Sequence, residues 1–290
     1  MAIPYTPALS DLCRTALRRA GQPAPSAGMV EEAMNHAFME VKNDIKFNTP
    51  THPILMTEEV QVTVLGVRSQ AQPTKCNVPV SVLLYDGPAE WRSTATAGAS
   101  GSITLAASLS EVEANLIGLP IFTLGGTGSL QYRHITAYDN STKIASVSPA
   151  WTTTPSSDTT YVICNYQREM YSTSKQVLNY DAYGFAGDDL PAYGTINGQQ
   201  LWLNKSPDKI YPLLWNYYID LDQIDENDAI HGKMLREWRN IVVQGVAAYS
   251  MQTYDDSRVN DQFQVYKFML DRLKSETLTV GQTVPYDPSY

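Results

Sequence analysis

Cysteine is scarce in this chain. Only Cys13, Cys76 and Cys164 occur in 290 residues, and they lie far apart. A disulfide framework in a small secreted protein needs an even set of cysteines, and a zinc site needs closely spaced Cys or His pairs. The three thiols are therefore predicted to be reduced and structural, as is typical of a protein made in the cytoplasm.

Long apolar runs are missing as well. No stretch approaches the roughly 18 to 20 apolar residues that are needed to span a bilayer. The opening Met-Ala-Ile-Pro has no basic region followed by an apolar one, so no secretory signal is predicted. The protein is expected to be made in and kept in the cytoplasm unless it leaves as part of a particle, and no membrane partner is predicted.

Positive charge is in short supply. The chain has 21 Lys and Arg against 30 Asp and Glu, a formal net charge of −9, and its cations are scattered. Binding to nucleic acid by counterion release needs clustered Lys and Arg, so a nucleic-acid-binding surface is not predicted. The hydrophobic content of 43% is enough for one or two ordinary cores, which indicates a globular protein.

Two amphipathic helices are predicted near the start of the chain. In the first, Thr6 is the expected N-cap, Pro7 the first helical residue and Gly21 the stop signal. The second is expected from about 29 to 46, with Glu31 and Glu32 in its first turn. The apolar positions repeat at three and four residues in both: Leu9, Leu12, Cys13, Ala16, Leu17 and Ala20 in the first, and Val30, Met34, Ala37, Phe38, Val41 and Ile45 in the second.

Two further helices are predicted near the end. One begins in the acidic run 225–228, where carboxylates favour a helix N-terminus, and the other opens after 255–257. Their predicted buried stripes are Leu235, Trp238, Ile241, Val242, Gly245 and Tyr249, and then Val259, Phe263, Tyr266, Leu270 and Leu273. Beyond Thr277 a glycine and two prolines disfavour helix, so 278–290 is predicted to be an extended tail.

Between the helices the apolar period changes to two, which is typical of strands. Segments 60–64 and 78–84 are predicted to be neighbouring strands. Residues 89–165, rich in Thr, Ser, Ala and Gly, are predicted to form a small β module. A further β stretch is expected at 195–219, on either side of a turn at 206–208, and 180–193 is expected to be a loop.

Candidate catalytic and ligand-binding patterns are weak. The glycine-rich run 125–128 lacks a following Gly-Lys-Ser/Thr, so it is interpreted as a turn. Carboxylates between Asp220 and Asp228 lack calcium-loop spacing and are interpreted as helix capping and a solvated edge. The four histidines, in separate settings, are His36, His52, His134 and His231. No catalytic, cofactor or metal site is predicted, and the aromatic residues are assigned to cores or subunit interfaces rather than to a sugar groove.

Two sets of motifs carry resemblances to known families. The ordered segments 94–98, 102–105, 118–121, 125–128, 135–139 and 147–155 resemble a β module that recurs in virion proteins of tailed bacteriophages. Leu201-Trp202-Leu203-Asn204 with Pro207, Asp208 and Tyr211, and then the segment 235–240, resemble phage head-to-tail adaptor (connector) proteins. The resemblance implies a helical bundle with β insertions, assembled as a ring, commonly of twelve copies, beneath the portal vertex. This chain departs from that family in the size of its insertion.

The predicted fold class is α+β. A discontinuous helical bundle is expected from 1–50 and 220–277, with a β region at 51–219 that includes the 89–165 module, and with the 278–290 tail. In the adaptor family a C-terminal extension often reaches into the portal or a neighbouring subunit. The resemblance places this tail in that position.

The predicted function is that of a non-catalytic structural virion protein in the phage neck, made in the host cytoplasm. Its expected partners are the portal protein, tail or nozzle proteins and further copies in a dodecameric ring, with genomic DNA passing through the lumen without sequence-specific binding. The predicted interaction residues are Val280, Val284, Tyr286, Tyr290, Arg236, Trp238 and Arg239. Two alternatives stay open: another phage tail or baseplate protein, and a carbohydrate-binding or weakly hydrolytic accessory protein.

Overall fold

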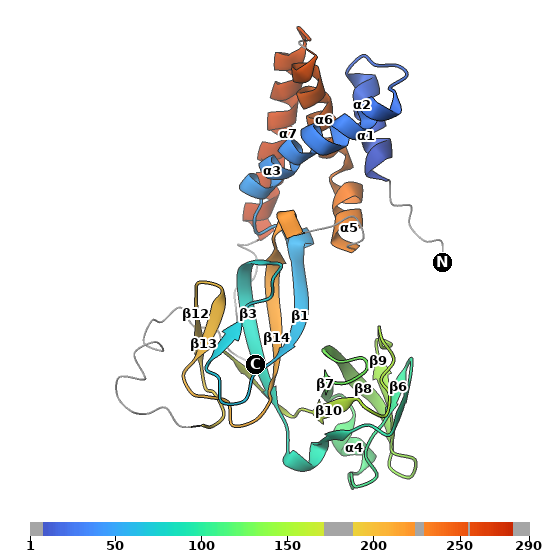
Figure 1. Ribbon diagram of the computed structural model, residues 1–290, viewed down its shortest axis with the longest axis vertical. Coiled ribbons are helices and arrows are strands. Elements are labelled where there is room, and N and C mark those ends of the chain that lie inside the picture. The colour runs from blue at the N-terminus through green and yellow to red at the C-terminus, as the bar shows by residue number, and fades with distance from the viewer. Residues whose placement is uncertain (1–7, 171–187, 224–228, 255, 281–290) are drawn as a thin grey trace. The chain divides into compact units, whose positions relative to one another are not determined.

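The computed structural model describes residues 8–170, 188–223, 229–254 and 256–280 (Figure 1). It contains helices at both ends of the chain and a large central region of antiparallel sheets, so the predicted α+β class is confirmed. The chain divides into two compact units: Met1–Thr57 with Lys75–Val78 and Tyr217–Tyr290 form a mainly helical unit, and Glu58–Thr74 with Pro79–Asn216 form a β unit.

The helical unit is built around one central helix. Its helices are α1 (Leu9–Arg19), α2 (Ala27–Glu32), the π-helix η1 (Ala33–Ala37), α3 (Phe38–Asn48), η2 (Pro53–Leu55), η5 (Leu221–Gln223), α5 (Ala229–Glu237), α6 (Arg239–Thr253) and α7 (Val259–Val280). Helix α6 packs against α1, α3, α5, η1 and α7, and is buried along most of its length. Segments from both ends of the chain therefore share one core.

Helix α1 buries the apolar face that its sequence predicts. All six predicted positions, from Leu9 to Ala20, are buried. The predicted N-terminus is wrong, because the helix begins at Leu9 with Ala8 as an N-cap of extended backbone, whose carbonyl accepts from Asp11 and Leu12. Thr6 and Pro7 lie outside the described residues. Gly21, with φ of 92°, follows the helix at the predicted stop.

The second predicted helix is interrupted. It begins at Ala27, two residues before the expected start, because the Oγ of Ser26 accepts a hydrogen bond from the Met29 amide. Glu31 and Glu32 consequently lie at its end rather than in its first turn. A π-helical turn over Ala33–Ala37 then separates α2 from α3. The predicted apolar stripe is otherwise correct, since Met34 alone of its six residues is only partly buried.

The third predicted helix is two helices. Helix α5 ends at Glu237 and α6 begins at Arg239, since Trp238 has φ of −99° and ψ of 17° and leaves the helical conformation. The indole of Trp238 is buried and meets the His52 ring edge to face, with the ring centroids 5.0 Å apart. The predicted acidic start at 225–228 lies outside the described residues.

Helix α7 is longer than predicted. It runs to Val280, so Leu278, Thr279 and Val280 belong to a helix rather than to an extended tail. The first helix-breaking residue in this part of the sequence is Gly281, which explains why the helix passes Thr277. The buried positions Tyr266, Leu270 and Leu273 follow the predicted stripe.

Two small sheets take up the strands outside the module. Their strands are β1 (Met56–Val62), β2 (Ser69–Ala71), β3 (Cys76–Asp86), β11 (Tyr166–Glu169), β12 (Gly194–Asn197), β13 (Gln200–Leu203) and β14 (Pro212–Ile219). The first sheet has the order β1-β14-β3-β11 and the second has the order β12-β13-β2. The predicted pairing of β1 with β3 is wrong, because β14 lies between them. The predicted turn at 206–208 joins no hairpin, because β13 and β14 belong to different sheets.

The third sheet accounts for the predicted β module. Its order is β4-β10-β7-β8-β9-β6-β5, and all its described pairings are antiparallel. The strands are β4 (Arg92–Thr94), β5 (Ala97–Ala99), β6 (Ser102–Thr104), β7 (Pro120–Gly125), β8 (Gln131–Asp139), β9 (Ile144–Ser148) and β10 (Thr160–Ile163), with the short helices η3 (Ala89–Trp91) and α4 (Glu113–Leu116). One buried cluster, from Trp91 to Ile163, forms its core.

The predicted loop at 180–193 falls partly outside the described residues. From 188 to 193 the chain has no helix and only an isolated bridge between Asp188 and Ser206.

Candidate interaction surfaces

The three predicted interaction residues around the α5–α6 junction differ in accessibility. Arg236 and Arg239 are exposed, and the Nε of Arg236 lies 3.4 Å from Oε1 of Glu237. Trp238, which lies between them, is only 4% exposed. Its indole is already packed within the helical unit, so the two arginines are the groups that this junction offers to a partner.

The predicted tail residues are only partly covered by the structure. Val280 is the last residue of α7, and Val284, Tyr286 and Tyr290 lie outside the described residues. The first three residues of the predicted tail, Leu278 to Val280, are therefore helical, and 281–290 lie outside the described residues.

Large apolar side chains are exposed on two helices of the helical unit. Phe47 on α3 is 92% exposed and Phe268 on α7 is 71% exposed; Met39 and Val265 are each 44% exposed. The sequence pattern contained the signal for them, because all four fall outside the predicted buried stripes. Such side chains are candidates for contact with another protein when they gather on one face.

A hollow opens beside the π-helix. Its volume is about 330 Å³, and it is lined by Leu17, Met29, Glu32, Ala33, His36, Ala37, Ser250, Thr253 and Tyr254. Burial, and then the charge of Glu32, raise the pKa of Tyr254, so its hydroxyl remains neutral and able to donate a hydrogen bond. π-turns are frequent at functional sites. His36 is exposed and lines this hollow.

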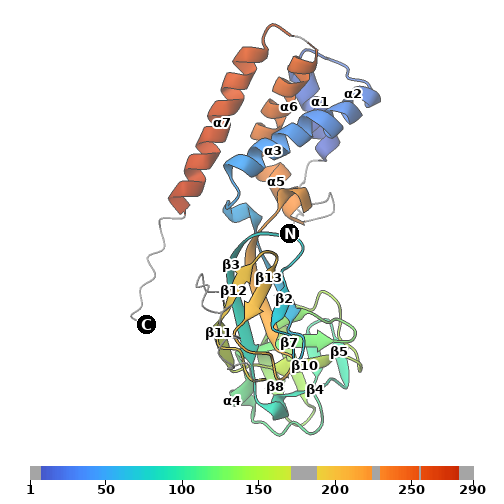
Figure 2. The same ribbon diagram turned by 60° about the vertical axis from the view of Figure 1, so that its left-hand side comes forward.

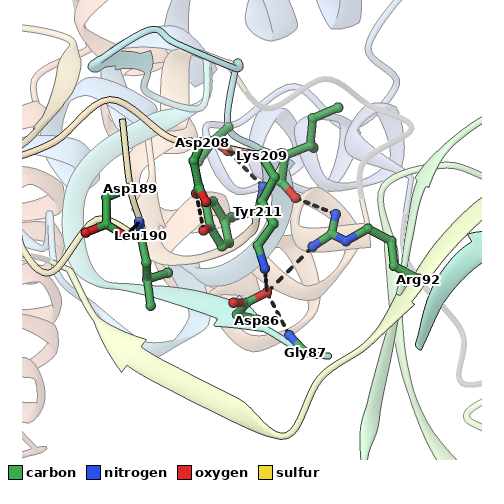
Figure 3. A network of polar contacts seen from close by, with 10 residues as sticks. Asp86, Gly87, Arg92, Asp189, Leu190, Asp208, Lys209 and Tyr211 are labelled. Atoms are coloured by element: carbon green, nitrogen blue, oxygen red, sulfur yellow. Dashed lines mark hydrogen bonds and ion pairs between the residues drawn. The ribbon is translucent and has the colours of Figure 1, made fainter. Parts of the chain in front are cut away.

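A polar network lies where the four-stranded sheet meets the module (Figure 3). Oδ1 of Asp86, at the end of β3, accepts from the Gly87 amide at 2.8 Å and lies 2.9 Å from Nζ of Lys209. An Nη atom of Arg92 lies 3.7 Å from the same oxygen, and the other Nη donates to the Ile210 carbonyl at 2.6 Å. One carboxylate thus ties the first strand of the module to the segment that precedes β14.

Tyr211 completes this network. Its hydroxyl donates to Oδ1 of Asp208, and Nζ of Lys209 lies 5.2 Å from the centre of its ring. Burial, with the hydrogen bond to Asp208 second, raises the pKa of Tyr211 far above its usual range, so the phenol stays protonated. The arrangement fixes backbone positions, and it could not be predicted from the sequence because Lys209 and Tyr211 lie far along the chain from Asp86 and Arg92.

A short loop in the β unit exposes apolar side chains. Val64, Leu65 and Val67 are 55%, 60% and 40% exposed. The loop backbone is held from inside, since the Gln70 side chain accepts from the Val64 amide at 3.0 Å and the Gly66 amide donates to the Pro207 carbonyl at 2.9 Å. This tip is a preorganised apolar surface that no sequence motif indicated.

The buried thiols and the carboxylates that precede α5 make contacts within the fold. Burial raises the pKa of the Cys13 and Cys164 thiols to about 12, which disfavours their reactive thiolates. Asp220 and Asp222 both pair with the ammonium of Lys46. Within the described ranges no group of three or more His, Cys, Asp and Glu side chains is placed to hold a metal ion, and none of the described helices is long and apolar enough to cross a membrane.

The glycine-rich run is the connection between β7 and β8, as its interpretation as a turn requires. Gly126 and Gly128 have φ of 78° and 71°, a conformation that glycine adopts readily. The amide and hydroxyl of Thr127 donate to Oδ2 of Asp158 at 3.0 and 3.1 Å. Both donors are occupied by a carboxylate of the protein itself, so they are not free to bind a phosphate group.

Aromatic rings of the β unit cover one another. Phe122 stacks on Tyr132 with centroids 5.0 Å apart, and Tyr85 lies 4.7 Å from Phe122. Phe122 is fully buried and Tyr85 is 6% exposed. A sugar-binding groove needs free ring faces, so this cluster serves packing rather than glycan recognition.

The residues that carry the adaptor resemblance also serve packing. Leu201, Leu203, Tyr211, Leu235 and Trp238 are all buried. The side chain of Asn204 accepts hydrogen bonds from the amides of residues 192 and 193, at 2.9 and 3.2 Å. No protein-family model matches the chain, and no curated protein matches it.

Proposed function

We propose that this protein is a structural component of the neck of a tailed bacteriophage, a head-to-tail adaptor that binds the portal ring and carries the tail. One observation carries the proposal: helices from both ends of the chain form one unit, and the β region between them is inserted into it. The same arrangement is implied by the sequence resemblance to adaptor proteins.

The surfaces of the described residues suit binding more than catalysis. The helical unit exposes large apolar side chains such as Phe47 and Phe268, and the β unit presents a rigid apolar tip at 64–67. A protein that joins two assemblies needs several separate contact surfaces, and these features lie on different elements. Portal contact is assigned to the 281–290 segment with Arg236 and Arg239, tail or nozzle contact to the β unit, and the ring to contacts between copies.

Acidity fits a channel wall in this proposal. The net charge of −9 would keep the phosphates of passing DNA from adhering to the protein, because binding to DNA needs clustered cations. Genomic DNA therefore passes through the ring without sequence-specific contact.

The test combines the purified chain with the portal protein of the same phage. Light scattering and negative-stain microscopy measure the mass and symmetry of the complex, with about one adaptor copy expected per portal subunit. Removal of residues 281–290 leaves all described helices in place and is expected to weaken portal binding, as is Arg236→Glu with Arg239→Glu. Arg14→Glu, at an exposed position of α1, is the control.

Absence of any complex between the full chain and the portal would refute the adaptor function. Portal binding that is unchanged by the truncation and by the paired arginine variant would instead refute the assignment of the portal-binding residues.

A further inference from the structure

The outward side of α7 combines apolar and basic side chains. Val265 and Phe268, three residues apart and so on the same face, are 44% and 71% exposed, whereas Tyr266, Leu270 and Leu273 point into the unit. Removing a Phe side chain from water stabilises a contact, so an exposed Phe on a regular helix is a candidate contact residue. Arg272 shares this face with Phe268, and Lys267 and Lys274 are exposed along its edge.

These five residues, Val265, Lys267, Phe268, Arg272 and Lys274, are called the α7 face. Between 265 and 275 the only carboxylate is Asp271, against three cations, so this part of the helix is positively charged; Asp261, one turn before Val265, is also exposed.

A second surface has the opposite charge. Across α2, η1 and the first turn of α3, Glu31, Glu32 and Glu40 are exposed, and no Lys or Arg occurs between 27 and 41. Met39, 44% exposed, adds apolar area. The hollow of about 330 Å³ lined by Glu32 and His36 opens in this surface. This set of three glutamates, Met39 and the hollow is called the acidic face.

Glu31, Glu32 and the hollow lie across the central helix from α7, whereas Met39 and Glu40 are on α3, which packs against both α6 and α7. Helix α6 packs against α7, and also against α1 and η1. Figure 1 and Figure 2 both show α7 on one side of α6 and α2 on the other. Within one copy the outward α7 face is therefore separated from Glu31, Glu32 and the hollow, and a second copy can present one to the other.

We propose that copies of this chain associate head to tail, with the α7 face of one copy docked on the acidic face of the next. Phe268 enters the hollow beside the π-helix, and the α7 cations lie against Glu31, Glu32 and Glu40. The contact joins two different surfaces, so it is heterologous and leaves one free face of each kind, which lets further copies add until a ring closes. The inference names the subunit contact of the proposed adaptor ring and rests on that function.

Charge-reversal variants test the pairing of the two faces. In one variant Glu31, Glu32 and Glu40 are changed to Lys; in the other Lys267, Arg272 and Lys274 are changed to Glu. Each variant alone brings like charges together at the contact. It is expected to remain monomeric in sedimentation velocity, over a concentration series in which the wild-type chain associates. An equimolar mixture of the two restores opposite charges at every contact and is expected to associate again.

A matched pair of phenylalanine variants tests the apolar anchor. Phe268→Ser is expected to weaken association about tenfold or more, as is usual for an aromatic interface anchor. Phe47→Ser removes a still more exposed ring that lies outside both faces and is expected to leave association unchanged. Circular dichroism verifies that all variants keep their helices.

Four results would each overturn the inference. They are a wild-type chain that is monomeric at every concentration, self-association of either charge variant alone, a mixture of the two that fails to associate, and equal effects of Phe47→Ser and Phe268→Ser on association. Association of the acidic-face variant alone would indicate a symmetric contact between two α7 faces.

Portal binding is measured separately. A chain that binds the portal but never self-associates refutes this subunit contact alone. A chain that self-associates but does not bind the portal refutes the adaptor function.

Discussion

Gly87 lies against the carbonyl of Ile163, and a Cβ atom on residue 87 would stand 1.9 Å from that oxygen. Gly87 is on the connection that enters the module after β3, and Ile163 is the last residue of β10, where the chain leaves it. The two connections therefore pass each other in backbone contact. Asp86 also contacts Gly87 and Arg92 here, so the segments by which the chain enters and leaves the module are held against each other.

Gly87→Ala is expected to destabilise the β unit by about 3 kcal/mol, because backbone atoms cannot move aside as a flexible side chain could. The urea midpoint of unfolding, followed by tryptophan fluorescence, measures the change. Gly101→Ala is the control, since a Cβ there meets nothing within 4 Å. Equal midpoints for both variants would show that the connections tolerate separation.

Gly245→Ala tests the core of the helical unit. A Cβ at this α6 position would lie 2.6 Å from Cε2 of Tyr266 and 2.6 Å from Cγ2 of Val41, both buried. Overpacking costs about 1–3 kcal/mol and exceeds the gain in helix propensity of about 1 kcal/mol, so the variant is expected to be less stable. Gly28→Ala on α2, where a Cβ meets nothing, is expected to be neutral or slightly stabilising. A Gly245→Ala protein as stable as the unchanged chain in thermal unfolding would contradict this packing.

The helical unit could largely be predicted from sequence because helix stripes report burial directly. The predicted faces of α1 and α7 are those that the structure buries, from Leu9 to Ala20 and from Tyr266 to Leu273. The break at Trp238 could not be predicted, because the apolar repeat continues through it. The π-turn at Ala33–Ala37 has no sequence signal either, since alanine is a good former of ordinary helix.

Sheet order and the binding surfaces were harder to predict. A period of two identifies a strand but not its partner, which is why β14 between β1 and β3 was missed. Phe268 could have been recognised as an apolar residue outside the buried stripe, whereas its counterpart, the hollow beside η1, depends on packing among α1, α2, η1 and α6. The Asp86–Lys209 pair joins residues more than 120 positions apart, which one sequence cannot show.

The cysteines are expected to differ in reactivity. Cys13 and Cys164 are buried with pKa values of about 12, whereas Cys76 is only partly buried. Iodoacetamide reacts with the thiolate, so at pH 8 the native protein is expected to be labelled at Cys76 first and at all three cysteines only after unfolding in urea. Mass spectrometry of the alkylated peptides measures this order. Labelling of Cys164 as fast as that of Cys76 would contradict the burial of Cys164 directly after β10.

Asp139 makes the stability of the β module depend on pH in the acidic range. The hydroxyl and amide of Ser141 and the hydroxyl of Thr142 donate to this exposed carboxylate at 2.6–2.8 Å, and these bonds lower its pKa to about 2. A carboxyl whose pKa is lowered by folding contributes stability above its unfolded value of about 3.9, and that contribution is lost as the pH falls through about 2. Ser141→Ala removes the strongest donor, so the pKa of Asp139 measured by carbon NMR titration is expected to rise toward the unfolded value. Ser110→Ala, at an exposed position elsewhere in the module, is expected to leave it unchanged, and an equal pKa in both variants would show that the Ser141 hydroxyl does not hold the carboxylate.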